Sequence, residues 1–171
     1  MRHVGFVGFV ANLWLWLARP ARDNKGEYGM LEWDDARHGL GVEGMDATHR
    51  EFVDMVMALA KADDGGFPTL FQQLVEHTRQ HFAEEGRLMR LCGFPPIAIH
   101  EGEHARVLEV LDRVGQIVQQ GDLAQARAFV NADLGEWFPR HLATMDRALA
   151  MHLMRTGHAD AAGGVLGASP L

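Results

Sequence analysis

Histidine and carboxylate side chains recur in this sequence at the spacing of metal ligands. The chain contains an HxxxE pair, an HxxxH pair and a histidine five residues before an aspartate. Residues four apart in an α-helix project from one face, so each of the first two pairs could present two ligands to one point. The candidate set comprises His49, His81, Glu85, His100, His104, His141 and Asp146.

Each pair alone is a weak signal, because such spacings occur readily by chance. A lone histidine on an amphipathic helix is also more often a packed or surface residue than a ligand. The joint pattern is more informative. Five imidazoles and two carboxylates buried together without a metal would leave many polar groups without partners, which is costly. We therefore predict a metal site.

The types and the number of the candidate ligands limit which metal ions, and how many, the site could hold. Imidazole and carboxylate without thiolate suit iron, zinc or manganese, and the lone Cys92 cannot hold a thiolate-bound zinc or cluster by itself. Seven ligands exceed what one tetrahedral or octahedral ion accepts, whereas two ions that share both carboxylates account for all of them. With an oxo or hydroxo bridge from solvent, the five histidines divide three and two, and one ion keeps an open coordination position.

Four helical segments must position these ligands. Apolar residues recur at three-to-four spacing, Asp46 is the expected N-cap of the first helix, and sequences rich in glycine or proline separate the helices. The expected helices cover residues 47–62, 68–91, 97–120 and 123–154. In an antiparallel bundle, the starts of helices one and three lie level with positions well along helices two and four, so all the ligands can meet.

The chain is therefore predicted to be all-α, an up-down-up-down four-helix bundle over residues 46–154. Residues 30–45 form an N-terminal arm in which Trp33 is expected to cover one end of the core. Residues 155–171 are rich in small residues without a clear period and are expected to form a flexible tail.

Residues 1–29 differ from the rest of the sequence. Positions 4–18 form a 15-residue run that is apolar except for Asn12, shorter than the roughly 20 residues of a spanning helix. No Ala-x-Ala cleavage site follows it. A weak membrane anchor, a poor export signal and sequence upstream of a true start at Met30 remain as interpretations. We favour the third interpretation, because every recognisable motif and helical pattern lies after Met30. Membrane association through residues 4–18 is therefore not favoured.

The composition excludes several classes of protein. The 171 residues, 47% hydrophobic and 23% charged, are typical of one globular domain rather than a disordered chain, a fibre or a disulfide scaffold. The net charge is −7 with scattered basic residues, so no nucleic-acid partner is expected. The expected location is cytoplasmic.

Four motifs resemble those of bacterial hemerythrins, a family of non-haem di-iron proteins that bind oxygen. They are LEWDDARHGLGVEGMDATH, HFAEEGRLMRLCGFP, the HxxxH pair and WFPRHLATMD, and the resemblance extends from Leu31 to Leu153. It implies that His100, His104 and His141 bind one iron and that His49 and His81 bind the other. It also implies that Glu85, Asp146 and an oxo or hydroxo group bridge the two irons.

The resemblance implies reversible oxygen binding for storage, transport or delivery rather than enzymatic turnover. Dioxygen would be the ligand, and an oxygen-consuming enzyme a further partner. The alternatives are an oxygen or redox sensor acting through a partner, and a di-iron oxidase or an enzyme that removes peroxide or nitric oxide. An apolar pocket that keeps the site dry would be lined by Phe52, Phe82, Trp137, Phe138 and Leu142.

Two residues depart from the family pattern. His77, four residues before His81, stands where the family usually has an aromatic residue, and we interpret it as a core residue or a neighbour of the ligands. Pro139 removes a helical hydrogen bond toward Gly135 and predicts a kink just before His141. Glu84 is expected to be solvated or to support a ligand. The remaining histidines, expected at the surface or in the termini, are His3, His38, His152 and His158.

Overall fold

The structure, a computed structural model, describes residues 31–162. The apolar leader (residues 1–29) and residues 163–171 of the expected tail lie outside the described residues. Residues 155–162 were also expected to belong to the flexible tail. They instead complete a helix and form a short turn that buries Ala162, which is 2% exposed.

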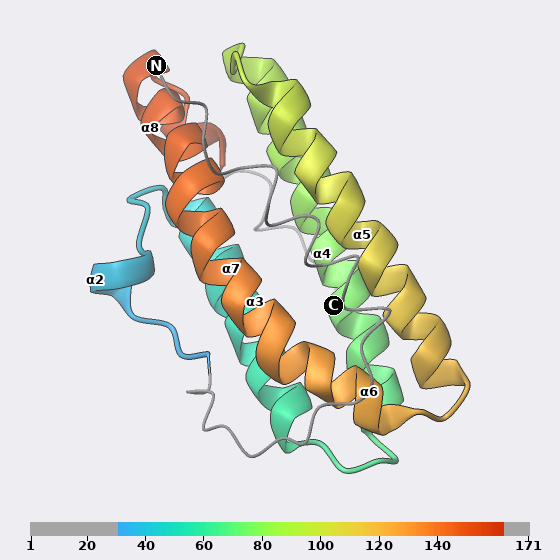
Figure 1. Cartoon of the computed structure of the whole chain (residues 1–171). Coiled ribbons are helices and arrows are strands. Elements are labelled where there is room, and N and C mark those ends of the chain that lie inside the picture. The colour runs from blue at the N-terminus through green and yellow to red at the C-terminus, as the bar shows by residue number, and fades with distance from the viewer. Residues whose placement is uncertain (1–30, 163–171) are drawn as a thin grey trace, which may run out of the picture.

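All secondary-structure elements of the described residues are helices, and these residues contain no strand. Three long helices, α3, α4 and α5, run alongside the connected helices α6 to α8, while the short α2 lies on the outside (Figure 1). The long helices are α3 (Glu43–Lys61), α4 (Phe67–Cys92) and α5 (Ile97–Gln119), and α2 spans Asp35–His38. This arrangement confirms the all-α fold class. No helix among the described residues combines the length and apolar character that a membrane span requires.

Local sequence explains where the long helices end. Beyond α3, the Asp63 side chain accepts the Gly66 N–H at 2.7 Å, which fixes the turn into α4. Pro68 follows at the start of α4, where its missing N–H would have had no helical partner. Gly93 ends α4 in the left-handed conformation, with φ of 64°, which a residue without Cβ adopts readily.

The fourth expected helix is continuous but irregular. Its consecutive segments are α6 (Leu123–Ala128), η1 (Phe129–Leu134), α7 (Gly135–His141), η2 (Leu142–Asp146) and α8 (Arg147–Thr156), followed by a 3₁₀ turn, η3 (Ala159–Ala161). Both η1 and η2 are π-helical. Pro139 lies inside α7, and the ribbon bends between α6 and α7, before the helix that contains the proline (Figure 1).

The prediction that Asp46 caps the first helix is wrong. Helix α3 begins at Glu43, with Val42 in the capping position, so Asp46 lies within the first turns. Its buried carboxylate instead accepts the backbone N–H groups of Leu40 at 2.8 Å and Gly41 at 3.0 Å. Asp46 therefore ties the N-terminal arm to the bundle, because its side chain satisfies donors that precede the helix rather than donors within it.

We expect Asp46→Ala to lower the free energy of unfolding by about 1–3 kcal/mol, since it leaves two arm N–H groups without their acceptor. Denaturant unfolding measures this change. The matched control is Asp54→Ala, at an exposed position of the same helix, which should change stability by less than about 0.5 kcal/mol. Equal effects of the two substitutions would contradict the role given to Asp46.

Candidate metal centre

The structure brings all seven predicted ligands together in the core of the bundle, and each is at most 8% exposed. Helix α3 carries one of them, α4 and α5 two each, α7 one and η2 one. They form two groups that share one carboxylate. One group is Glu85, His100, His104, His141 and Asp146, and the other is His49, His81 and Glu85.

Glu85 faces both groups. Its Oε2 lies 3.2 Å from His104 Nε2 and 3.5 Å from His100 Nε2. Its other oxygen, Oε1, lies 3.8 Å from His81 Nε2. One carboxylate thus directs one oxygen toward the three-histidine group and the other oxygen toward the two-histidine group.

Asp146 repeats this arrangement from the opposite side of the bundle. Its Oδ1 lies 3.0 Å from His141 Nε2 and 3.2 Å from His100 Nε2, whereas its Oδ2 lies 3.5 Å from His49 Nε2. The π-helical segment η2 makes this possible. An i→i+5 hydrogen-bonding pattern brings residues five apart onto one face, whereas a regular α-helix would turn Asp146 well away from His141.

Several buried polar atoms in this cluster have no hydrogen-bond partner. They include both oxygens of Glu85, Oδ1 of Asp146 and both ring nitrogens of His49. Buried groups left in this state each cost on the order of 1–3 kcal/mol, so they are rare in native structures unless an ion or water satisfies them. Carboxylate oxygens and imidazole nitrogens are atom types that coordinate metal ions, so these unpartnered atoms fit bound cations.

Burial also sets the protonation of the imidazoles. It lowers the pKa of His49 and of His104, and it holds the pKa of His81 well below its usual value, where the nearby His49 adds to the effect. These rings are therefore neutral at neutral pH, which is the form that coordinates a metal.

The two carboxylates differ. Burial, reinforced by the charge of Asp146, raises the pKa of Glu85 well above its usual value. Burial opposes ionisation of Asp146 as well. For Asp146, however, the charge of His141 and the close approach of the His100 and His141 rings outweigh burial and hold its pKa well below the usual value. Without a cation, the site thus favours only one ionised carboxylate.

Aromatic rings lie flat against two ligands of the three-histidine group. The ring of Phe82 stacks on His104 with centroids 3.7 Å apart and planes inclined by 2°. Trp137 stacks on His141 at 4.7 Å and 25°. Both aromatic residues were predicted to line the site, and both contact ligand rings directly.

The two-histidine group has aromatic neighbours too. Phe138 meets His49 edge-on at 5.7 Å and stacks on Phe52 at 4.9 Å. Trp33, from the arm, lies over His49 at 6.4 Å and 27°. The predicted cover of the core by Trp33 is therefore a cover over one ligand. Leu142, the remaining predicted lining residue, is 1% exposed.

Three other polar residues lie near the ligands. His77 hydrogen-bonds to Glu51 on α3, with Nε2 and Oε2 3.1 Å apart. Glu84 pairs with Arg87 at 3.0 Å. Sequence analysis missed Glu103, a 5% exposed carboxylate that accepts the indole N–H of Trp137. The helical period could have indicated that Glu103 is buried, because positions 100, 103, 104 and 107 fall on one face of the helix.

A small cavity of about 10 Å³ adjoins the two-histidine group, lined partly by His81 and Glu85. The final turn closes over it: Ala162 contributes to the lining, and Arg87 donates a hydrogen bond to the Ala161 carbonyl at 3.3 Å. Space beside these ligands is therefore limited to a molecule of a few atoms.

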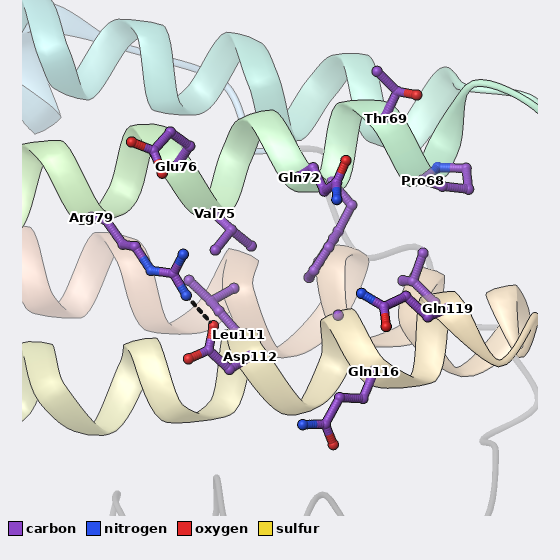
Figure 2. Close-up of a pocket in the computed structure, with 13 residues that line it drawn as sticks. Pro68, Thr69, Gln72, Val75, Glu76, Arg79, Leu111, Asp112, Gln116 and Gln119 are labelled. Atoms are coloured by element: carbon purple, nitrogen blue, oxygen red, sulfur yellow. Dashed lines mark hydrogen bonds and ion pairs between the residues drawn. The ribbon is translucent and has the colours of Figure 1, made fainter.

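A wider groove of about 680 Å³ lies between α4 and α5, away from the cluster (Figure 2). Glutamine side chains line its rim, and an ion pair between Arg79 and Asp112 crosses one end. None of the seven candidate ligands lines it. The groove is therefore separate from the candidate metal centre.

Comparison with known proteins identifies the family of this chain. Residues 40–153 match a family model described as the hemerythrin HHE cation binding domain. The chain belongs to the hemerythrin family. Its relatives include a bacteriohemerythrin of Ralstonia nicotianae (strain ATCC BAA-1114 / GMI1000), 35% identical over 128 residues that cover 75% of this chain and 92% of the relative. A bacteriohemerythrin of Stenotrophomonas maltophilia (strain R551-3) is 25% identical over 146 residues, covering 81% and 94% of the two chains.

The fold is similar to that of a solved hemerythrin. The crystal structure of a hemerythrin point mutant superposes with a TM-score of 0.67 at 21% identity, covering 72% of this chain and 97% of that one. Membership of the hemerythrin family makes this chain a di-iron oxygen-binding protein in general terms, and the buried cluster of histidine, glutamate and aspartate is the candidate for its metal-binding site.

The neutral buried imidazoles predict how the metal-free protein responds to acid. Below pH 6.5 the unfolded chain protonates His49, His81 and His104 more readily than the folded chain does, because burial lowers their pKa values in the fold. Glu85 acts in the opposite direction above pH 4.5, since its folded pKa is raised. Three groups outweigh one, so stability should fall as the pH drops from 6.5 to 4.5, by about 1.4 kcal/mol per pH unit for each net proton.

Urea unfolding of the chelator-treated protein between pH 4.5 and 8 measures this slope. His81→Gln removes one of the three titrating rings, and it should reduce the slope by about one proton. A stability that is constant or increases on acidification through this range would contradict the assigned protonation states.

Proposed function

We propose that this hemerythrin-family chain binds dioxygen reversibly at a di-iron centre, for oxygen storage, transport or delivery. The ligands of one iron are His100, His104 and His141, and those of the other are His49 and His81. The bridging groups are Glu85, Asp146 and a solvent-derived oxo or hydroxo group. The observation that carries the proposal is that each buried carboxylate directs one oxygen toward each histidine group.

The composition of the ligand set favours binding over oxidation chemistry. A pair of ferrous ions supplies the two electrons that reversible capture of dioxygen requires. As ligands, five imidazoles would contribute no negative charge, and two carboxylates alone would provide little to stabilise iron beyond the ferric state. The uneven division of the histidines would give the ion held by His49 and His81 one protein ligand fewer than its neighbour.

The surroundings of the ligands support the same function. Reversible binding needs a dry pocket, because water and protons would displace the bound ligand and leave the metal oxidised. Phe52, Phe82, Trp137, Phe138 and Leu142 are each at most 6% exposed and surround the ligands with apolar surface. The small cavity beside His81, about 10 Å³, leaves room for about one water-sized molecule next to this group.

Anaerobic loading with ferrous iron, followed by oxygen, tests the function. We expect two irons per chain and a visible absorption band that appears with oxygen and disappears when oxygen is removed. Irreversible conversion to a ferric form with release of a product would support the enzymatic alternative instead. Binding of a single zinc ion would overturn the di-iron assignment.

Glu85→Gln tests the bridging carboxylate. It should weaken metal binding strongly, yet raise the stability of the metal-free protein at pH 7 by about 1 kcal/mol. The gain is expected because the substitution removes a buried carboxylate whose ionisation is disfavoured. Iron content and denaturant unfolding measure the two effects. Glu84→Gln, at the adjacent residue that pairs with Arg87, is the control and should retain two irons.

A further inference from the structure

Glu103 is a buried carboxylate that the metal centre does not use. It is 5% exposed, and the side chain of the next residue, His104, points into the ligand cluster. Consecutive residues of an α-helix point about 100° apart, so the two side chains serve different neighbours. Glu103 Oε1 accepts the indole N–H of Trp137 at 3.2 Å, and Oε2 accepts the Nε–H of Arg106 at 3.3 Å.

Trp137 links this carboxylate to the ligands. Its indole is 4% exposed and lies over the imidazole of His141 at 4.7 Å and 25°. Its edge also meets the face of Phe82, which stacks on His104. A buried indole N–H needs an acceptor, and that single directional bond fixes how the ring can turn. Glu103 therefore determines the plane against which His141 packs.

His141 needs such support more than the other ligands do. It is the last residue of α7, two residues after Pro139 and directly before the π-helical segment η2. A proline and a change of helix type on either side weaken the control that regular backbone hydrogen bonds give over a side chain. Side-chain packing must then fix the ring, and Trp137 supplies it.

Hydrogen bonds do not take over this role elsewhere in the cluster. In most metal sites the second ring nitrogen of each histidine donates to a carboxylate or carbonyl group. Here Nδ1 of His49, His100 and His104 has no partner among the described residues. Phe82 stacks on His104 and Trp137 stacks on His141, and Glu103 is the polar group that anchors the second of these aromatic rings.

We propose that Glu103 is a positioning residue of the metal centre, which acts through Trp137 to fix the orientation of His141. The proposal rests on the proposed di-iron function. It predicts that Glu103→Leu weakens one of the two metal-binding steps by about 10- to 100-fold, the usual range for a group that orients a ligand. Glu103→Gln keeps an acceptor for the indole N–H, so it should restore most of the affinity.

Cobalt(II) is the probe, because its ligand-field absorption reports ligand geometry without any oxygen chemistry. Each variant is titrated with cobalt(II) against a competing chelator, and its melting temperature is measured in parallel. The matched control is Glu101→Leu, the same substitution two residues earlier on α5, where an exposed glutamate pairs with Arg90. The control should keep the wild-type cobalt spectrum and affinity.

A double-mutant cycle separates positioning from a general effect on stability. Trp137→Phe keeps an aromatic ring but removes the N–H group, so Glu103→Leu should have little further effect on cobalt affinity in that background. Additive losses of affinity, or a Glu103→Leu protein with wild-type cobalt spectrum and affinity, would overturn the proposal. If Glu103→Leu does not fold, Glu103→Gln and Trp137→Phe complete the test, since only the latter should alter the cobalt spectrum.

The wild-type titration distinguishes failure of this proposal from failure of the proposed function. If the wild-type chain binds fewer than two cobalt ions, the dinuclear function is wrong and the positioning role is wrong with it. If the wild-type chain binds two ions and Glu103→Leu behaves identically, only the role of Glu103 is overturned.

Discussion

The structure depends on placing five imidazoles and two carboxylates inside an apolar helical bundle. The two carboxylates alone present three buried oxygens without hydrogen-bond partners, and burial raises the pKa of Glu85. Hydrophobic packing elsewhere in the bundle must offset that cost until cations bind. The same buried polar groups therefore lower the stability of the metal-free bundle and favour the binding of cations.

The irregular fourth helix is the geometric consequence of that requirement. A ligand pair five residues apart cannot share a face of a regular α-helix, whereas the π-helical segment η2 brings His141 and Asp146 to the same point. The regular α-helical hydrogen bonds are interrupted at the segment that must bring these two side chains together. The bend upstream of Pro139 lies in the same irregular helix as the two candidate ligands (Figure 1).

Sequence alone predicted the helices and the convergence of the seven ligands, because hydrophobic period and ligand spacing are properties of one helix at a time. It failed where the partner lies elsewhere. Asp46 matches an N-cap by residue type, yet it binds the arm that precedes the helix. The π-helical segments have the same apolar pattern as an α-helix. Glu103 shares a helical face with His100 and His104, but only the fold shows that its partner is Trp137 on another helix.

The way the imidazoles are held bears on the chemistry of the bound metal. A carboxylate on the second ring nitrogen makes a histidine ligand more basic and donates electron density to the metal. At His49, His100 and His104 no such partner exists among the described residues, and the aromatic rings packed against His49 and His104 hold them without donating charge. His49 and His104 are thus held in place but are weak electron donors. Under the proposed function this combination favours return of the ferrous state when dioxygen leaves, since an electron-rich ligand set would stabilise the oxidised metal instead.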